Sequence, residues 1–269
     1  MLNKFFLVFI ALFSCSVNYV FAEEAKPLVF GVVNVQSAVK TAERWNPILK
    51  YLSDNTGYSF QLKMGTTVVE TDKMMKDEEF DVVFTNHNFQ KQYDGIYKVI
   101  ARWAGEPINC VIAVPDNSNI KTLKDLTGKK VAFPSKSAFI SYAVPMAELN
   151  KKHIVVEQVF GGNQEGIMSQ LKANQVDAIA ANSRFLEKYS AEKNLKYKEI
   201  FVSEDFAEIP VLVHPRLSAK QVSAIKKALL KMSTDPQAAQ ILKIADFKGF
   251  DAASEKDYKN ARQVYKAIE

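Results

Sequence analysis

The sequence predicts an α/β protein with two similar lobes, and two patterns point to that class. Short apolar runs alternate with amphipathic segments from residue 28 to the end of the chain, which is typical of βα units built around largely parallel sheets. Two of these runs share a polar frame: Asp81 and Asp177 stand near their starts, and Asn86 and Asn182 follow five residues later. The repeated frame indicates that the second half of the chain builds a lobe like the first.

The first lobe is expected to span residues 23–114. A helix over 41–55 carries Trp45, Ile48 and Leu52 on one stripe and ends at Gly57. The other elements of this lobe are a helix at 68–76 and strands at 28–34, 60–64, 80–85, 97–103 and 108–114.

The second lobe is expected to span residues 115–205, entered through a polar turn at 115–118 and a short helix at 123–126. Its predicted strands lie at 131–133, 154–159 and 176–181, and its helices at 138–150, 164–173 and 184–192. Residues 206–269 then return to the first lobe. That return is predicted as a strand at 209–214 and three helices at 218–232, 236–244 and 255–268.

The N-terminus has the composition of a secretory signal. Lys4 precedes an apolar run from Phe5 to Phe13, and no acidic residue occurs before Glu23. The apolar run is too short to span a bilayer, so we expect export and cleavage after Ala22. In an alternative interpretation, Cys15 becomes the lipidated first residue of a lipoprotein, which we rank lower because the preceding motif contains a bulky phenylalanine.

The overall composition restricts the function classes. Removal of the signal leaves Cys110 as the single cysteine, so no intramolecular disulfide is expected. The chain is long enough, and at 48% hydrophobic residues apolar enough, to bury the cores of two lobes. Its lysines are scattered among acids instead of concentrated on one element, which argues against a nucleic-acid partner.

Signatures of catalysis are scarce. The sequence has no nucleophile elbow, no glycine-rich phosphate loop and no pair of histidines at helical spacing, so we expect no catalytic residues, metal or cofactor. Only His87 with Glu165 offers an acid/base pair for an enzyme of this fold. Cys110 lies within a predicted strand, where a free cysteine is usually a small buried hydrophobe; a thiolate ligand for a soft metal or metalloid is the alternative.

Several residues are candidates for a ligand cleft because they follow strands. The carboxyl ends of strands face the ligand crevice in open α/β sheets, which favours Asn86, His87 and Asn182. Both asparagines are equally consistent with simple helix caps. Phe139 at a predicted helix start, and Trp103 more weakly, are expected to line the cleft wall, although most aromatic side chains belong to the core.

The segments together resemble a known family. The resemblance is carried by Trp45-Asn46-Pro47-Ile48-Leu49-Lys50-Tyr51-Leu52, the strand at 80–84, the segment 123–133, Val176-Asp177-Ala178 and Asp235-Pro236, in this order and spacing. From about residue 28 to 267 the chain resembles the phosphate/phosphite/phosphonate periplasmic binding proteins of ABC transporters. The resemblance implies the type 2 binding-protein fold, in which two lobes, each with a mixed, mostly parallel sheet flanked by helices, close on a ligand. It further implies a monomer in the periplasm.

The ligand site departs from the family pattern. The family's Ser-Thr-Ser run, which holds phosphonate oxygens, falls on Ala138, Phe139 and Ile140, and its next glycine falls on Ser141. The family's glycine-proline turn after the third strand becomes Asn86-His87. The remaining correspondences place a family tyrosine on Val68, an aromatic residue on Phe89, and polar ligand contacts on Asn163, Gln164, Glu165, Asn182 and Ser183.

These departures imply a changed ligand. Each lost charge-assisted hydrogen bond to a dianion costs about 1.5 to 3 kcal/mol, so phosphonate is not the expected ligand. We expect a small molecule with an apolar face and a few hydrogen-bonding groups. Its apolar face is expected to meet Phe139, Ile140, Val68 and Phe89, and its polar groups Asn86, His87, Gln164, Glu165 and Asn182.

Alternatives remain open at the level of the partner. The protein serves either the permease of an ABC importer or a membrane sensor such as a histidine kinase or cyclase. A variant of the sensor hypothesis has Cys110 bind arsenite or a similar thiophilic oxyanion. An enzyme of the same fold, and an interaction protein with an empty cleft, are lower alternatives.

Overall fold

The computed structural model describes residues 26–33 and 38–269, and it divides them between two sheets. The first sheet contains β1 (Leu28–Val32), β2 (Phe60–Lys63), β3 (Val82–Phe84), β4 (Lys98–Trp103), β10 (Pro210–Val213) and β11 (Phe250–Ala252). The second contains β5 (Cys110–Pro115), β6 (Lys130–Phe133), β7 (Glu157–Phe160), β8 (Ala178–Asn182) and β9 (Tyr197–Val202). The strand orders are β11-β4-β10-β3-β1-β2 and β7-β6-β8-β5-β9, each mixing parallel and antiparallel pairs.

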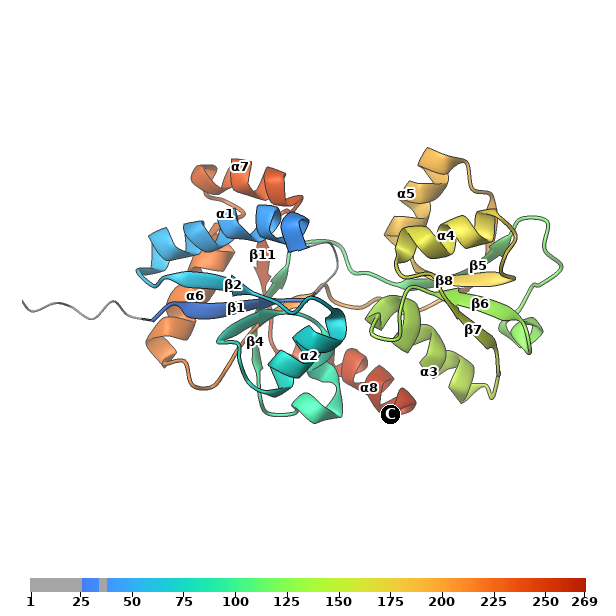
Figure 1. Ribbon diagram of the computed structural model, residues 1–269, viewed down its shortest axis with the longest axis horizontal. Helices are drawn as coiled ribbons and strands as arrows, with labels where there is room; N and C mark the ends of the chain where they lie inside the picture. Colours follow the sequence, from blue (N-terminus) through green and yellow to red (C-terminus); the bar gives the residue numbers. More distant parts are fainter. Residues whose placement is uncertain (1–25, 34–37) are drawn as a thin grey trace, which may run out of the picture.

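Helices flank both sheets and confirm the two-lobed α/β architecture (Figure 1). Around the first sheet lie α1 (Ala38–Thr56), α2 (Val68–Lys76), α6 (Ala219–Lys231) and α7 (Pro236–Ala245). Around the second lie α3 (Val144–Lys151), α4 (Gln164–Lys172) and α5 (Ser183–Lys193). Short helical turns add η1 (His87–Phe89), η2 (Lys91–Tyr93), η3 (Leu123–Leu126), the π-helical η4 (Phe139–Ala143) and η5 (Glu255–Tyr258).

The apolar stripe predicted on α1 forms the centre of the first lobe. Trp45 is buried, with its ring 5.1 Å from Phe30 and 4.8 Å from Phe84. These contacts pack α1 against the strands β1 and β3, which are parallel neighbours. Burial of such aromatic side chains contributes roughly 1.5 to 3 kcal/mol each relative to exposure. The sequence periodicity therefore led correctly to the packing face of this helix.

The strand predicted at 108–114 was assigned to the wrong lobe. It is β5, and it lies inside the second sheet between β8 and β9. The chain therefore crosses between lobes before this strand, over residues 104–109, and the polar turn at 115–118 lies within the second lobe. A continuous apolar run predicts a buried strand, but it does not indicate which of the two sheets contains that strand.

Two segments of chain and one helix join the lobes. The crossings, residues 104–109 and 203–209, pair with each other through Ile108 and Phe206, whose backbones exchange hydrogen bonds of 2.9 and 2.7 Å. The C-terminal helix α8 (Lys259–Ile268) lies beside α3 of the second lobe, below the junction in Figure 1. Among the described residues, one of the three clusters of buried apolar side chains accordingly continues from the first lobe into the second.

The predicted secretory signal, with its cleavage site and Cys15, lies outside the described residues. Within residues 26–33 and 38–269, no helix is long and apolar enough to cross a membrane.

Candidate functional site

Each sheet has a point at which the chain connections change direction. In the first sheet β1 lies between β2 and β3, so the chain leaves β1 toward one side and returns to build β3 on the other. The second sheet repeats this order with β6 between β7 and β8. In open α/β sheets ligands bind outside the carboxyl ends of the strands at such points. The two switch points are therefore candidate positions for a ligand site.

Both switch points lie at the junction of the lobes. At the end of β3, the Thr85 N–H donates to the Pro210 carbonyl at 3.3 Å, next to the second crossing. At the end of β8, the Ser183 N–H donates to the Asn109 carbonyl at 3.2 Å, next to the first crossing. The residues that follow β3 and β8 therefore approach the junction from opposite lobes.

Three of the predicted site residues meet at the switch point of the second lobe. The Gln164 side chain donates to the Ser141 hydroxyl at 2.6 Å, and its carbonyl oxygen accepts from the Asn182 N–H at 3.3 Å. Gln164 begins α4, Ser141 belongs to η4 after β6, and Asn182 ends β8. One amide thus ties together three segments that are distant in sequence, and it holds polar groups beside the lobe junction.

The asparagines of this region also cap helices. The Asn182 side-chain oxygen accepts from the Arg184 N–H at 3.1 Å, and the Asn163 oxygen accepts from the Gly166 N–H at 2.8 Å. The capping alternative therefore describes the Asn182 side chain in this structure, and Asn163 caps α4 in the same way. Glu165 is exposed in the first turn of α4, where its negative charge interacts favourably with the helix dipole.

The helix after β6 begins with a π-helical turn, which is wider than a turn of α-helix. In η4 the Ala143 N–H donates to the Ala138 carbonyl, 3.1 Å away and five residues back, and the Val144 N–H donates to Phe139. This geometry leaves the N–H groups of Phe139, Ile140 and Ser141 without an acceptor inside the helix. The corner can therefore still offer backbone donors, although the side chains at 138–140 carry no hydroxyl.

The apolar wall predicted for the ligand is covered by the chain's own C-terminal segment. Phe139 is 5% exposed, with its ring 5.2 Å from Tyr265 of α8 and 5.1 Å from Phe206 of the second crossing. Ile140 is similarly buried. The expectation of an open apolar surface at these positions is not met here, because η4 uses its apolar side chains to bind α8.

Phe89 is covered in the same way from the first lobe. Its ring stacks on Tyr258 at 4.6 Å between centroids, and the Arg262 guanidinium lies 5.3 Å from the ring centroid. Phe139 and Phe89, two of the aromatic residues predicted for the wall, thus both contact the segment from η5 to α8. Asn86, which precedes η1, is half-buried, and its carbonyl accepts from the Phe89 N–H at 3.5 Å.

The remaining candidates lie apart from this cluster or inside the core. Trp103 packs in the first lobe with its ring 4.6 Å from Phe247. Cys110 is fully buried opposite Asn182 on β8, and burial raises the pKa of its thiol, which keeps it protonated. Val68 begins α2 after the cap residue Thr67, and His87 begins η1; the structure describes their backbones but not their side chains.

A charged pair at the junction was missed by sequence reasoning. Arg184 Nη2 of α5 lies 2.6 Å from Glu208 Oε1 in the second crossing, and it also donates to the carbonyls of Glu106 and Pro107 in the first. Glu208 is 3% exposed, and burial raises its pKa while Arg184 opposes that shift. Its position between Ala207 and Ile209 was the available signal, because a lone acid in an apolar stretch is often buried with a partner.

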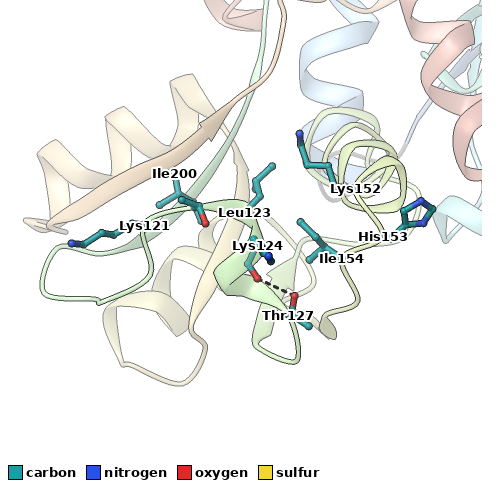
Figure 2. A pocket seen from close by; sticks show the side chains of 9 residues that line it. Lys121, Leu123, Lys124, Thr127, Lys152, His153, Ile154 and Ile200 are labelled. Atoms are coloured by element: carbon teal, nitrogen blue, oxygen red, sulfur yellow. Dashed lines mark hydrogen bonds between the residues drawn. The ribbon is translucent and has the colours of Figure 1, made fainter.

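A shallow pocket of about 540 Å³ lies elsewhere, on the second lobe (Figure 2). Its lining residues are Lys121, Thr122, Leu123, Lys124, Thr127, Lys152, His153, Ile154 and Ile200. They come from η3, β9 and the end of α3, not from the carboxyl ends of β6 or β8, so this pocket is separate from the switch points. In the described part of the chain, no group of three His, Cys, Asp or Glu side chains could hold a metal ion.

The fold and the paired switch points define a two-lobed solute-binding protein. Residues 30–258 match the family model of the ABC transporter, phosphonate, periplasmic substrate-binding protein. The chain belongs to this family of non-enzymatic substrate-binding proteins, which confirms the resemblance. Membership implies a location outside the cytoplasm, a small ligand and a permease partner.

Solved structures of low sequence identity share the fold. The binding protein component of an ABC phosphonate transporter from Pseudomonas aeruginosa is 18% identical, with a TM-score of 0.72 over 89% of this chain and 85% of its own. PhnD1 from Prochlorococcus marinus, in complex with methylphosphonate, is 19% identical, with a TM-score of 0.74 over 90% and 98%. XAC2383 from Xanthomonas citri, bound to ATP, is 15% identical, with a TM-score of 0.78 over 90% and 96%.

One curated relative is an enzyme, and the match to it is partial. It is the ATP phosphoribosyltransferase of Pelotomaculum thermopropionicum, 28% identical over 140 residues. Those residues are 48% of this chain and 47% of the relative, so the chain matches about half the length of that enzyme.

Proposed function

We propose that this protein captures a small polar molecule between its lobes, at the two switch points, and delivers it to the permease of an ABC importer. The observation that carries the proposal is the Gln164 amide, which joins Ser141 and Asn182 at the lobe junction. Together with the free N–H groups of η4, it supplies hydrogen-bonding groups where ligands bind in open α/β sheets. Closure of the lobes around the molecule forms the surface that the permease recognises.

We further propose that the ligand is not a phosphonate. Ala138, Phe139 and Ile140 offer no hydroxyl, and the Ser141 hydroxyl already accepts from Gln164. Because Phe139 packs on Tyr265 of α8 and Ile140 is buried, the contacts that hold the ligand come from polar groups and backbone N–H donors, not from an apolar wall. This replaces the expectation that an apolar face of the ligand meets Phe139 and Ile140.

Native mass spectrometry of the protein purified from its own periplasm tests the proposal. We expect a bound small molecule that Gln164→Ala loses and that the exposed Gln61→Ala retains. Methylphosphonate and ATP, the ligands named for two structural relatives, are the first added probes. A protein that carries nothing contradicts capture, and a bound alkylphosphonate contradicts the exclusion of phosphonate.

The route of export and the partner have separate tests. We propose cleavage after Ala22 to give a monomer, which intact mass and light scattering on the secreted protein check; a lipidated Cys15 would show as an added acyl mass. A gene for a permease and an ATPase beside this one supports import. A neighbouring histidine kinase or cyclase would instead favour a sensor partner.

A further inference from the structure

We propose that Asn88 is a ligand-binding residue that selects for a molecule with adjacent hydrogen-bond donor and acceptor groups; this inference rests on the proposed function. The Asn88 side chain is fully buried, yet neither its nitrogen Nδ2 nor its oxygen Oδ1 has a hydrogen-bond partner. Buried amides are almost always paired, because an unpaired one loses its bonds to water and gains none in return. An unpaired buried asparagine therefore indicates a partner supplied from outside the chain.

The position of Asn88 identifies where that partner would bind. Asn88 is the middle residue of η1, which follows β3 at the switch point of the first lobe. Its neighbour Phe89 stacks on Tyr258, and η1 contacts α8, which in turn contacts η4 of the second lobe. Asn88 therefore belongs to the first-lobe side of the same junction that holds Ser141 and Gln164 on the second-lobe side.

The amide also restricts the chemistry of the ligand. Nδ2 donates and Oδ1 accepts, so both atoms are satisfied by a group that presents an acceptor next to a donor, such as an amide, a protonated carboxylic acid or the edge of a purine. A bare oxyanion would leave Oδ1 facing negative charge. The inference thus agrees with the loss of the family's hydroxyl run, which is an independent observation.

Two variants separate this role from a structural one. Asn88→Leu replaces both unpaired atoms with methyl groups in the same branched arrangement, and we expect the ligand-free protein to melt about 2 to 4 °C higher. Asn88→Ala cannot clash with its surroundings, so it replaces the leucine variant if that variant does not fold.

For both variants we expect at least a tenfold loss of affinity for the molecule that co-purifies with the wild type, measured after its release and re-addition. Asn55→Leu, in which the replaced amide bonds the Tyr51 carbonyl on α1, is the matched control and should keep the ligand without raising the melting temperature.

The possible results distinguish the two proposals. A wild-type protein that captures nothing overturns the proposed function and this inference with it. A wild-type protein whose ligand binds Asn88→Ala with unchanged affinity overturns this inference alone. A melting temperature lowered in every folded Asn88 variant, with ligand affinity unchanged, would show that an internal water satisfies the amide and would also overturn it.

Discussion

The ring of Phe139 in the second lobe lies 5.2 Å from the ring of Tyr265 on the C-terminal helix, inclined to it by 32°. This contact explains why apolar residues stand where the family has hydroxyls. η4 binds α8, and α8 continues to the first-lobe residues around Phe89 through η5. The C-terminal helix is therefore a third connection between the lobes, in addition to the two crossings.

The first prediction concerns this aromatic contact. Phe139→Ala removes a ring buried against Tyr265 and Phe206 and should lower the free energy of unfolding by roughly 3 to 5 kcal/mol. Urea denaturation measures the loss. Phe139→Leu, which keeps most of the volume, should cost much less, and a double-mutant cycle with Tyr265→Leu should show a coupling of about 0.5 to 1.5 kcal/mol. Strictly additive effects would mean that the rings do not interact.

The second prediction concerns the charged pair at the junction. Arg184→Ala leaves the buried Glu208 carboxylate without its ion-pair partner and should destabilise the protein by about 2 kcal/mol. The loss is smaller than for a fully buried pair because Arg184 is 45% exposed and Arg102 still acts on the carboxylate. Adding Glu208→Gln to Arg184→Ala should restore much of that loss, since no buried charge then remains. If the double variant is no more stable than Arg184→Ala, the unpaired Glu208 charge is not the cause of the lost stability.

The third prediction is a pH dependence that follows from Glu208. Burial raises its pKa in the folded protein above the ordinary value of 4.5, so folding takes up a proton in the window between these two values. The wild type should therefore gain stability relative to Glu208→Gln as the pH falls from neutral toward the ordinary carboxyl value of 4.5. Thermal unfolding of both proteins across this range checks the sign, and a difference that stays constant with pH would contradict it.

The fourth prediction concerns Cys110. Because it is fully buried and burial raises the pKa of its thiol, it should not react with an aromatic disulfide reagent in the native protein and should react in guanidinium chloride. Cys110→Ala should leave capture of the co-purified ligand unchanged. A melting temperature that arsenite shifts in the wild type but not in Cys110→Ala would instead support binding of a thiophilic oxyanion by Cys110.

Much of the fold was accessible from sequence patterns, and its failures have clear causes. The stripe on α1 and the Asp-to-Asn frame of β3 and β8 placed helices and strands within a few residues of their observed bounds. Two strands left no predictive pattern: β9, whose residues are largely exposed or half-buried, and β11, which has three residues. The candidate site was accessible only in part. Ser141, Gln164 and Asn182, which were named as site residues from the sequence, are joined by hydrogen bonds of the Gln164 amide, but Asn88 and the Arg184–Glu208 pair were not among the predicted residues.

The sequence by itself determined the class of each segment, because periodicity and caps depend on neighbours three to five residues away. It also determined that the family's hydroxyl run had been replaced. Only the tertiary structure shows what the apolar replacement contacts. The partners of Phe139 are Phe206 and Tyr265, which lie 67 and 126 residues further along the chain. Contacts at such separations leave no local pattern in the sequence. The apolar residues of η4 were therefore predicted to face a ligand, whereas in the structure Phe139 packs against the C-terminal helix.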